Sequence, residues 1–323
     1  MALHATLLRL GMTCPIFQAP VGAIASPELA ATVSNAGGLG HLACTWRPPE
    51  GLRALFGTMA GLTDRPYGAN FVLDFAIEER LDAALDSGVR VISFFWGDGG
   101  PYVPRVHAAG AVAVQVVGAI SEARRAAEAG FDLIVAQGRE AGGHVRGELG
   151  TMALLPQVVD AVAPLPVLAA GGIADRRGVA AAQALGASGV WVGTRFLAAT
   201  EANIHPRYQD RVIASSADDT LYSDLFDGGW PNAPLRTLRT ATTEAWEAAG
   251  RPTAPQRPGE GDIVAWRADG SGIARYFFSS PTKDMSGDVE AMALYAGEGV
   301  GLVRARQKAA AIVADLTSGW ASS

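Results

Sequence analysis

Short apolar runs alternate with helical stretches between Pro15 and about Thr200, and this alternation constrains the fold more than any other feature of the sequence. The runs are apolar almost throughout, as is typical of parallel strands covered on both faces. The stretches between them, such as SPELAATVSNAG, often begin with Ser, Thr or Asp and end with Gly, which are common helix caps. The predicted strands are PIFQAP (15–20), GLGHLA (38–43), PYGANFVL (66–73), RVISFFW (90–96), AVAVQVV (111–117), FDLIVAQ (131–137), PLPVLAA (164–170) and SGVWVGT (188–194).

Eight strands, each followed by a helix, is the number found in a closed barrel. A doubly wound open sheet is the alternative architecture. That fold commonly carries the glycine pattern GxGxxG after its first strand, and the pattern is absent here. The sequence therefore predicts an α/β fold of the (β/α)8 TIM-barrel type.

The pattern changes after about Ser215. Residues 221–285 are rich in Gly, Pro, Trp and Arg and contain the turn-rich stretch RPTAPQRPGEGD. We interpret them as a lid-like insertion after the eighth strand that shapes the substrate pocket. From Asp288 the helical pattern returns, and VRARQKAAAIVADL is predicted to form the last helix on the barrel. The expected domains are a barrel of residues 1–220 and 286–323 and a substrate or lid insertion of residues 221–285.

Charge and cysteine content exclude several classes of protein. The net charge of −6 and pI of 5.4 argue against a nucleic-acid-binding protein, which usually needs a basic face. The two cysteines, Cys14 and Cys44, have no metal-ligand spacing and predict neither a metal site nor a disulfide framework. The N-terminus lacks a signal-peptide pattern, and no apolar run reaches the roughly 18 residues needed to span a bilayer. We expect a cytoplasmic protein, monomeric or homodimeric, with no membrane or nucleic-acid partner.

Two glycine-containing turns follow the seventh and eighth predicted strands. They contain Gly171-Gly172 and Gly193-Thr194. Glycine lets backbone N–H groups approach an anion closely, and a threonine hydroxyl adds a donor. Phosphate sites of TIM barrels recur at this place. The alternative for the first turn is a tight connection in which Asp175 caps the next helix, but the second motif on the neighbouring strand favours a phosphate site.

His144 is the candidate catalytic residue. It ends the loop QGREAGGH (137–144) after the sixth predicted strand, so it is expected at the barrel mouth beside two glycines. An imidazole there can take a proton from a weak carbon acid or stabilise an anion. The remaining histidines are interpreted as structural, and they are His4, His41, His107 and His205.

Three amide side chains, Gln18, Asn70 and Gln115, interrupt otherwise apolar strands. A buried amide needs hydrogen-bond partners. The polar edge of a flavin ring would provide them, and bonds to one another or to the backbone are the alternative. The three together favour a heteroaromatic ligand.

Other polar residues near these motifs are less informative. Glu140 and Glu148 flank His144; either could orient the imidazole, but solvated carboxylates are the preferred interpretation. Arg236 and Arg239 are interpreted as an exposed helix face. For Tyr295 two roles stay open, one over the pocket and one in packing.

These motifs together resemble the nitronate monooxygenase family, formerly called 2-nitropropane dioxygenases. The resemblance lies in PIFQAP, SPELAATVSNAGGLG, TDRPYGANF, AQGREAGGH, LAAGGIADRRG, GTRFLAATE and AGEGVGLV, and it covers about residues 15–205 and 292–302. It implies that FMN binds over the barrel mouth and that His144 deprotonates a nitroalkane or steadies the nitronate. O2 would be the co-substrate, and the products would be a carbonyl compound and nitrite, without any need for a reduced nicotinamide. The cofactor-binding residues implied by the motifs are Gln18, Ala19, Pro20, Asn70, Gln115, Gln137, Gly142, Gly143, Gly171, Gly172, Trp191, Val192, Gly193 and Thr194.

One departure and two alternatives accompany this resemblance. After PIFQAP the family commonly has Met, whereas this chain has Val21-Gly22-Ala23-Ile24, so the pocket floor is expected to differ. The AGGH and GGIAD motifs also occur in FMN-dependent enoyl-[acyl-carrier-protein] reductases and related quinone reductases, which use a nicotinamide hydride. A non-catalytic flavin- or metabolite-binding barrel is the third hypothesis.

Overall fold

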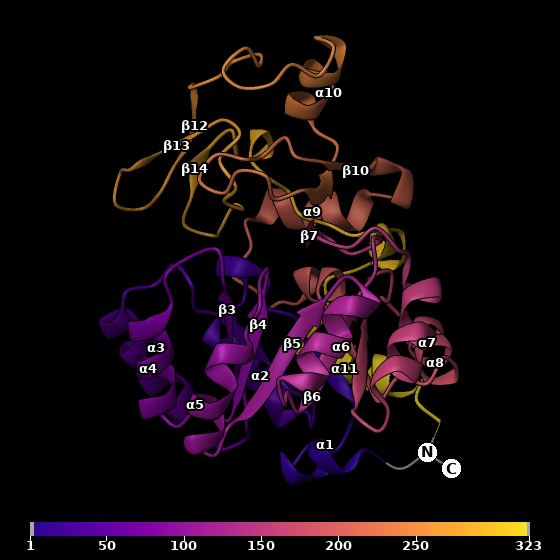
Figure 1. Ribbon diagram of the computed structural model, residues 1–323. Helices are drawn as coiled ribbons and strands as arrows, with labels where there is room; N and C mark the ends of the chain where they lie inside the picture. The colour runs from indigo at the N-terminus through magenta and orange to yellow at the C-terminus, as the bar shows by residue number, and fades with distance from the viewer. Residues whose placement is uncertain (1–2, 322–323) are drawn as a thin grey trace.

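The computed structural model describes residues 3–321, and a barrel of eight parallel strands forms its lower half (Figure 1). The strand order is β1-β9-β8-β6-β5-β4-β3-β2, and a parallel bridge between Phe17 and Leu39 joins the two ends. Each predicted apolar run contains one strand, so the predicted barrel is confirmed. The strands are β1 (Ile16–Gln18), β2 (His41–Ala43), β3 (Gly68–Val72), β4 (Val91–Phe95), β5 (Val112–Val117), β6 (Leu133–Gln137), β8 (Val167–Ala170) and β9 (Gly189–Val192).

Helices surround the barrel. Ser26 caps α2 by accepting a hydrogen bond from the Leu29 N–H, and Asp175 caps α8 in the same way through the Arg177 N–H. The last helix, α11, packs between α2 and α8 and completes the ring. The helices are α2 (Pro27–Asn35), α3 (Pro49–Leu62), α4 (Glu78–Asp86), α5 (Val103–Ala108), α6 (Ile120–Glu128), α7 (Thr151–Val162), α8 (Arg176–Ala184) and α11 (Ala309–Thr317).

The last helix is shorter than predicted. It begins at Ala309, whereas the sequence pattern placed its start at Val303. The preceding residues are held in an extended path, because the Gln307 N–H donates to Ala198 O at 3.0 Å and Gln307 O accepts from the Thr200 N–H at 2.9 Å. Pairing with the segment after β9 thus replaces the first helical turns.

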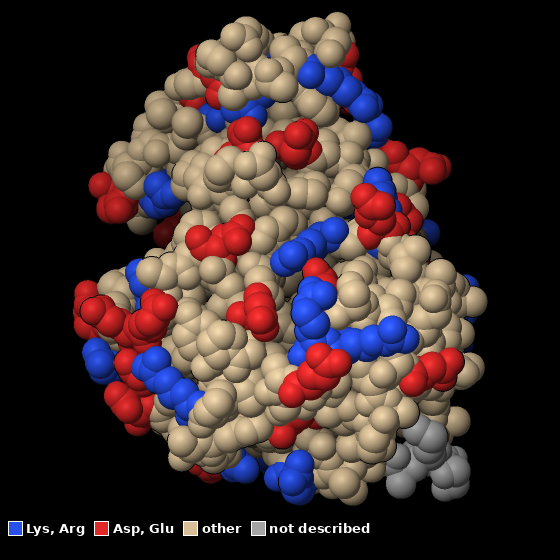
Figure 2. All heavy atoms as spheres, in the orientation of Figure 1, with Lys and Arg blue, Asp and Glu red and all other residues tan. Residues whose placement is uncertain are grey.

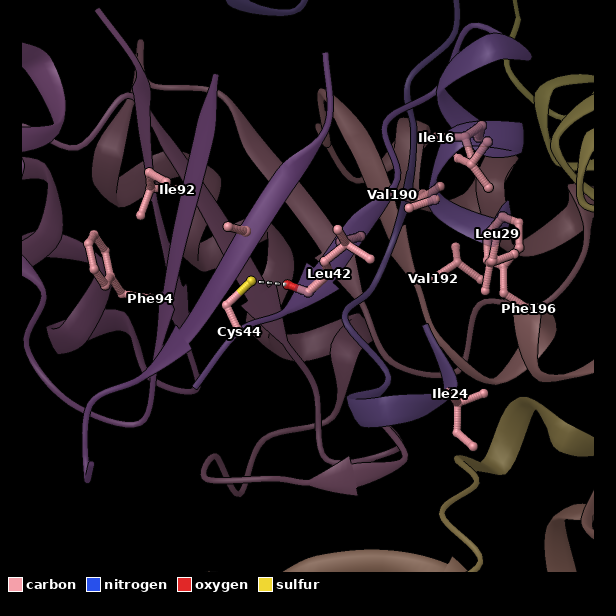
Figure 3. Packing of buried hydrophobic residues seen from close by; sticks show 14 of the residues in the cluster. Ile16, Ile24, Leu29, Leu42, Cys44, Ile92, Phe94, Val190, Val192 and Phe196 are labelled. Atoms are coloured by element: carbon pink, nitrogen blue, oxygen red, sulfur yellow. Dashed lines mark hydrogen bonds between the residues drawn. The ribbon is translucent and has the colours of Figure 1, made fainter. Parts of the chain in front are cut away.

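Two apolar layers stabilise the barrel. Inside it, Leu7 of the first helix, α1 (Ala5–Arg9), and Leu10 directly after that helix pack against strand residues such as Leu133, and Figure 1 shows α1 beneath the barrel. Between strands and helices, Figure 3 shows Ile16, Leu29, Val190, Val192 and Phe196 gathered together. Fully burying one such side chain contributes roughly 1.5–3 kcal/mol. Both cysteines are buried and unpaired, and the Cys44 thiol donates to Leu42 O at 3.6 Å (Figure 3).

A second layer stands above the barrel (Figure 1). It contains an antiparallel sheet in the order β10-β11-β7 and another in the order β13-β12-β14. Figure 2 shows a notch between the barrel and this layer, and acidic and basic side chains are interspersed on the face seen there. The elements are β7 (Gly143–His144), β10 (Thr220–Ser223), β11 (Leu235–Leu238), β12 (Ile263–Trp266), β13 (Gly272–Ala274), β14 (Ser286–Gly287), α9 (Pro206–Ala214) and α10 (Ala241–Ala248).

The expected insertion, residues 221–285, falls within this layer. Its division from the barrel as a separate domain stays a prediction. Within residues 3–321, no helix is long and apolar enough to cross a membrane.

Candidate active site

A cavity of about 520 Å³ lies between the barrel mouth and the upper layer. Its walls come from the turns after β1, β6, β8 and β9 and from residues of the upper layer. The structure thus brings together most of the site predicted from the sequence. The predicted residues that line the cavity are Ala19, Pro20, Asn70, Gln137, Gly142, Gly143, His144, Gly171, Gly172, Trp191, Gly193 and Thr194.

Three predicted residues do not line this cavity. Gln18 is fully buried and accepts a hydrogen bond from the His41 N–H at 3.1 Å. Gln115 accepts from the Gly99 N–H at 3.1 Å and donates to Gly97 O at 3.2 Å. Val192 packs in the layer between strands and helices. The two glutamines thus bond to the backbone, which was the alternative to a flavin ligand. Of the three amides, Asn70 alone lines the cavity.

The two predicted phosphate turns line the same cavity. Gly171 and Gly172 have φ values of +104° and +71°, in the left-handed region that favours glycine. Within the described residues, the N–H groups of Gly172 and Gly193 have no acceptor. Thr194 follows Gly193 at the start of a short 3₁₀ helix. Free backbone donors at neighbouring turns form an environment suited to a phosphate.

A C-terminal segment, residues 296–299, binds these turns to the His144 loop. The Gly297 N–H donates to Thr194 Oγ1 at 3.0 Å, and the Glu298 N–H donates to Glu140 O at 2.9 Å. A Cβ on Gly142 would lie 2.4 Å from Gly297 N, so this contact requires glycine. Gly297 was not predicted as a site residue. The available signal was the repeated glycine of the AGEG stretch.

The carboxylate of Glu140 is hydrogen-bonded within the protein, so its interpretation as a solvated group is wrong. Its carboxylate accepts from the Thr151 N–H at 2.9 Å and from Thr151 Oγ1 at 3.1 Å. It therefore stabilises the N-terminus of α7, where a negative charge is favourable. Thr151 Oγ1 also lies 3.1 Å from Gly171 O, so Thr151 connects Glu140 to the first phosphate turn. Glu148 is exposed, as expected.

Arg236 lies in strand β11 and is buried, so its interpretation as part of an exposed helix face is wrong. The strand pairs with β7, and Arg236 stands opposite Gly143. Its guanidinium lies 3.0 Å from Glu298 and donates to Arg139 O at 3.0 Å. Arg239 follows this strand, outside any helix, and pairs with Glu247. Arg236 thus joins the His144 loop to the C-terminal segment.

The imidazole of His144 stands at the cavity wall among aromatic rings. Its centroid lies 3.9 Å from that of Trp230, 5.6 Å from that of Tyr295 and 6.4 Å from that of Phe278. Burial lowers the pKa of His144 to about 3, so the ring is neutral at neutral pH. Its Nε2 is buried and has no hydrogen-bond partner in the described residues. Trp230 and Phe278 were missed in the sequence because a turn-rich segment gives no periodic signal.

Gln137 provides a second buried polar atom without a partner close to His144. Its Nε2 donates to the His144 backbone oxygen at 3.2 Å, whereas its Oε1 is buried and unpartnered within residues 3–321. A buried acceptor without a partner is costly unless a ligand donates to it. The N–H of a flavin ring is such a donor.

Three of the other histidines have the hydrogen-bonded structural roles predicted for them, whereas neither ring nitrogen of His41 has a partner within residues 3–321. His4 and His205 accept hydrogen bonds at the starts of α1 and α9. His107 pairs with Asp132 at 2.8 Å on the surface. His41 lies inside the barrel with its ring centroid 4.3 Å from that of Trp191.

Because His41 is buried, the protein is expected to lose stability in acid. Burial lowers its pKa from 6.5 to about 3, so below pH 6.5 the unfolded chain takes up a proton that the folded chain does not. The free energy of unfolding therefore has its full value above pH 6.5 and decreases as the pH falls towards 3. At pH 5 this decrease is about 2 kcal/mol. Urea unfolding at pH 7.5 and 5 should therefore show a smaller drop in the free energy of unfolding for His41→Leu than for the wild type. Equal drops would contradict this assignment.

Comparisons with known proteins identify the family. Residues 6–79 and 74–319 match the family model described as nitronate monooxygenase. The chain belongs to the nitronate monooxygenase family. This is a family of flavin-dependent oxidoreductases with the TIM-barrel fold, so the predicted enzyme class is confirmed.

Relatives within this family carry different names. The chain is 38% identical over 245 residues, 75% of its length and 68% of the relative's, to a Mycobacterium tuberculosis protein named (3aS,4S,5R,7aS)-5-hydroxy-7a-methyl-1-oxo-octahydro-1H-indene-4-carboxyl-CoA dehydrogenase. It is 34% identical over 277 residues, covering 69% of this chain and 78% of the relative, to a nitronate monooxygenase of Pseudomonas aeruginosa. Among solved structures it is similar to FabK from Thermotoga maritima, with a TM-score of 0.84 and 30% identity over 98% of this chain and 96% of that one.

Proposed function

We propose that this protein is an FMN-dependent enzyme that oxidises nitronates and nitroalkanes with O2 to a carbonyl compound and nitrite. The observation that carries this proposal is that His144, whose Nε2 has no hydrogen-bond partner within residues 3–321, lines the same cavity as two turns with free backbone donors. The similarity to the nitronate monooxygenase of Pseudomonas aeruginosa supports it.

The residues of the cavity fit FMN. The N–H groups of Gly172 and Gly193 and the hydroxyl of Thr194 would hold the phosphate, and Asn70 and Gln137 would bond the ring edge. Bound there, the flavin supplies the electron acceptor for the substrate.

His144 would act on the carbon next to the nitro group. The proton leaves that carbon for the imidazole, which leaves a nitronate anion beside an imidazolium. Since burial holds the pKa of His144 near 3, this transfer depends on the pairing of the two charges in a site from which aromatic rings exclude water. A preformed nitronate needs no such transfer and should be the better substrate.

A reductase is the second candidate, and the name of one relative favours it. The Mycobacterium tuberculosis protein is called a carboxyl-CoA dehydrogenase. An enzyme of this kind would transfer a hydride between an acyl thioester and a nicotinamide by way of FMN.

Anaerobic spectroscopy separates the two candidates. The FMN-loaded protein is mixed first with NADH or NADPH and then with a nitronate, while flavin absorbance is recorded. Bleaching by the nitronate alone, with nitrite formed once O2 is admitted, supports the proposal. Fast bleaching by a reduced nicotinamide alone supports the reductase, and failure to bind FMN contradicts both.

A further inference from the structure

One end of the cavity is walled by aromatic side chains. Trp46 follows β2, Phe75 follows β3 and Phe95 ends β4, while further rings come from the upper layer and the segment before residue 296. The aromatic lining residues at this end are Trp46, Phe75, Phe95, Trp230, Phe277, Phe278 and Tyr295.

This aromatic end lies across the barrel from the phosphate turns. The turns follow β8 and β9, whereas Trp46, Phe75 and Phe95 belong to the region of β2, β3 and β4. In the closed strand order, β3 and β4 stand opposite β8 and β9. A flavin whose phosphate occupies the turns therefore leaves the aromatic end free for the substrate.

These rings pack against one another and form a continuous aromatic wall. The Trp46 centroid lies 5.3 Å from that of Phe278, 5.5 Å from that of Phe75 and 6.1 Å from that of Trp230. Trp46 is 43% exposed, so a ligand can cover apolar surface that water now contacts. Aromatic walls of this kind favour flat or bulky apolar bodies.

Arg267 supplies a positive charge at the same cavity. Glu140 is the other residue of the lining that carries a full charge at neutral pH, and its carboxylate is used by Thr151. Its guanidinium donates to Ser271 Oγ at 3.2 Å and lies 6.0 Å from the centroid of the Phe277 ring. The exposed carboxylate of Asp269 interacts with its charge, but within residues 3–321 Arg267 forms no salt bridge. Such a cation next to an aromatic wall suits the anionic end of a ligand.

We propose that the substrate is a bulky aryl or alicyclic compound with an anionic end. Its rings lie against Trp46 and Phe278, its reacting carbon faces His144, and its anionic group pairs with Arg267. The position of the reacting carbon rests on the proposed function, whereas the placement of the rings and of the anion holds for either flavin reaction.

Binding of 2-naphthoate, which cannot react, directly tests whether the aromatic wall and Arg267 bind such a ligand. Titrated into the FMN-loaded enzyme, it should quench tryptophan fluorescence and perturb the flavin spectrum. Trp46→Ala should raise its dissociation constant about tenfold, since contact with the Trp46 ring is lost. Trp266→Ala is the matched control, because Trp266 is 44% exposed and lies outside the cavity lining, and it should leave the constant unchanged. Arg267→Gln should weaken the binding of 2-naphthoate but leave the binding of 2-naphthol, which lacks the carboxylate, unchanged.

Turnover distinguishes a failure of this inference from a failure of the proposed function. The nitronate of phenylnitromethane should have a kcat/KM about tenfold above that of nitroethane, and Trp46→Ala should abolish the difference. If naphthoate binding depends on Trp46 but no nitronate is oxidised, the substrate shape stands and the proposed function is overturned. If nitroethane nitronate reacts as well as the aryl compound and Trp46→Ala leaves naphthoate binding unchanged, this inference is overturned and the function stands.

Discussion

Replacing His144 with alanine is expected to lower kcat/KM for a neutral nitroalkane by about 10²–10⁴-fold, the usual effect of losing a positioned base. The variant should keep FMN, because the phosphate turns and Asn70 are untouched. The effect should be much smaller for a preformed nitronate, which has already lost its proton. Nitrite release from both substrates measures the two losses.

The pattern of losses identifies the role of the imidazole. Equal losses for both substrates would show that His144 stabilises the anion instead of removing the proton. Unchanged turnover of both would remove His144 from the mechanism. His107→Ala is the control, since His107 lies on the surface against Asp132 and should affect neither substrate.

The barrel was predictable from the sequence because its strands are buried on both faces. Each strand is then a continuous apolar run, which stands out without any knowledge of its neighbours. The phosphate turns were predictable for a similar reason, since Gly171-Gly172 and Gly193-Thr194 are local patterns at the ends of such runs.

Side-chain direction and distant pairing were not predictable. Gln18 and Gln115 lie in strands as expected, but a run that is apolar on both faces does not tell which way a polar residue points. Arg236 was assigned to the wrong element because its strand is defined by pairing on both sides, with Tyr222 of β10 and with Gly143, far away in the sequence. The rings around His144 come together only when the upper layer folds over the barrel mouth.

Substituting Gly142 with alanine should weaken FMN binding more than tenfold and lower Tm. The added Cβ would lie 2.4 Å from Gly297 N and 2.6 Å from Ala296 C, and backbone atoms cannot move aside as a flexible side chain can. The His144 loop and residues 296–299 must separate, which disturbs the bond from the Gly297 N–H to Thr194 Oγ1. Overpacking of this kind costs about 1–3 kcal/mol. Fluorescence titration of the apoprotein with FMN and thermal unfolding measure the two effects.

Gly57→Ala provides the matched control for this substitution. Gly57 lies within α3, and a Cβ there would meet nothing within 4 Å. Alanine should therefore raise stability slightly, because it is favoured over glycine in a helix by about 1 kcal/mol, and FMN affinity should not change. If Gly142→Ala also bound FMN with wild-type affinity, the C-terminal segment would have no part in shaping the cofactor site. A loss confined to Gly142→Ala would show that residues 296–299 hold the phosphate turns and the His144 loop in one arrangement.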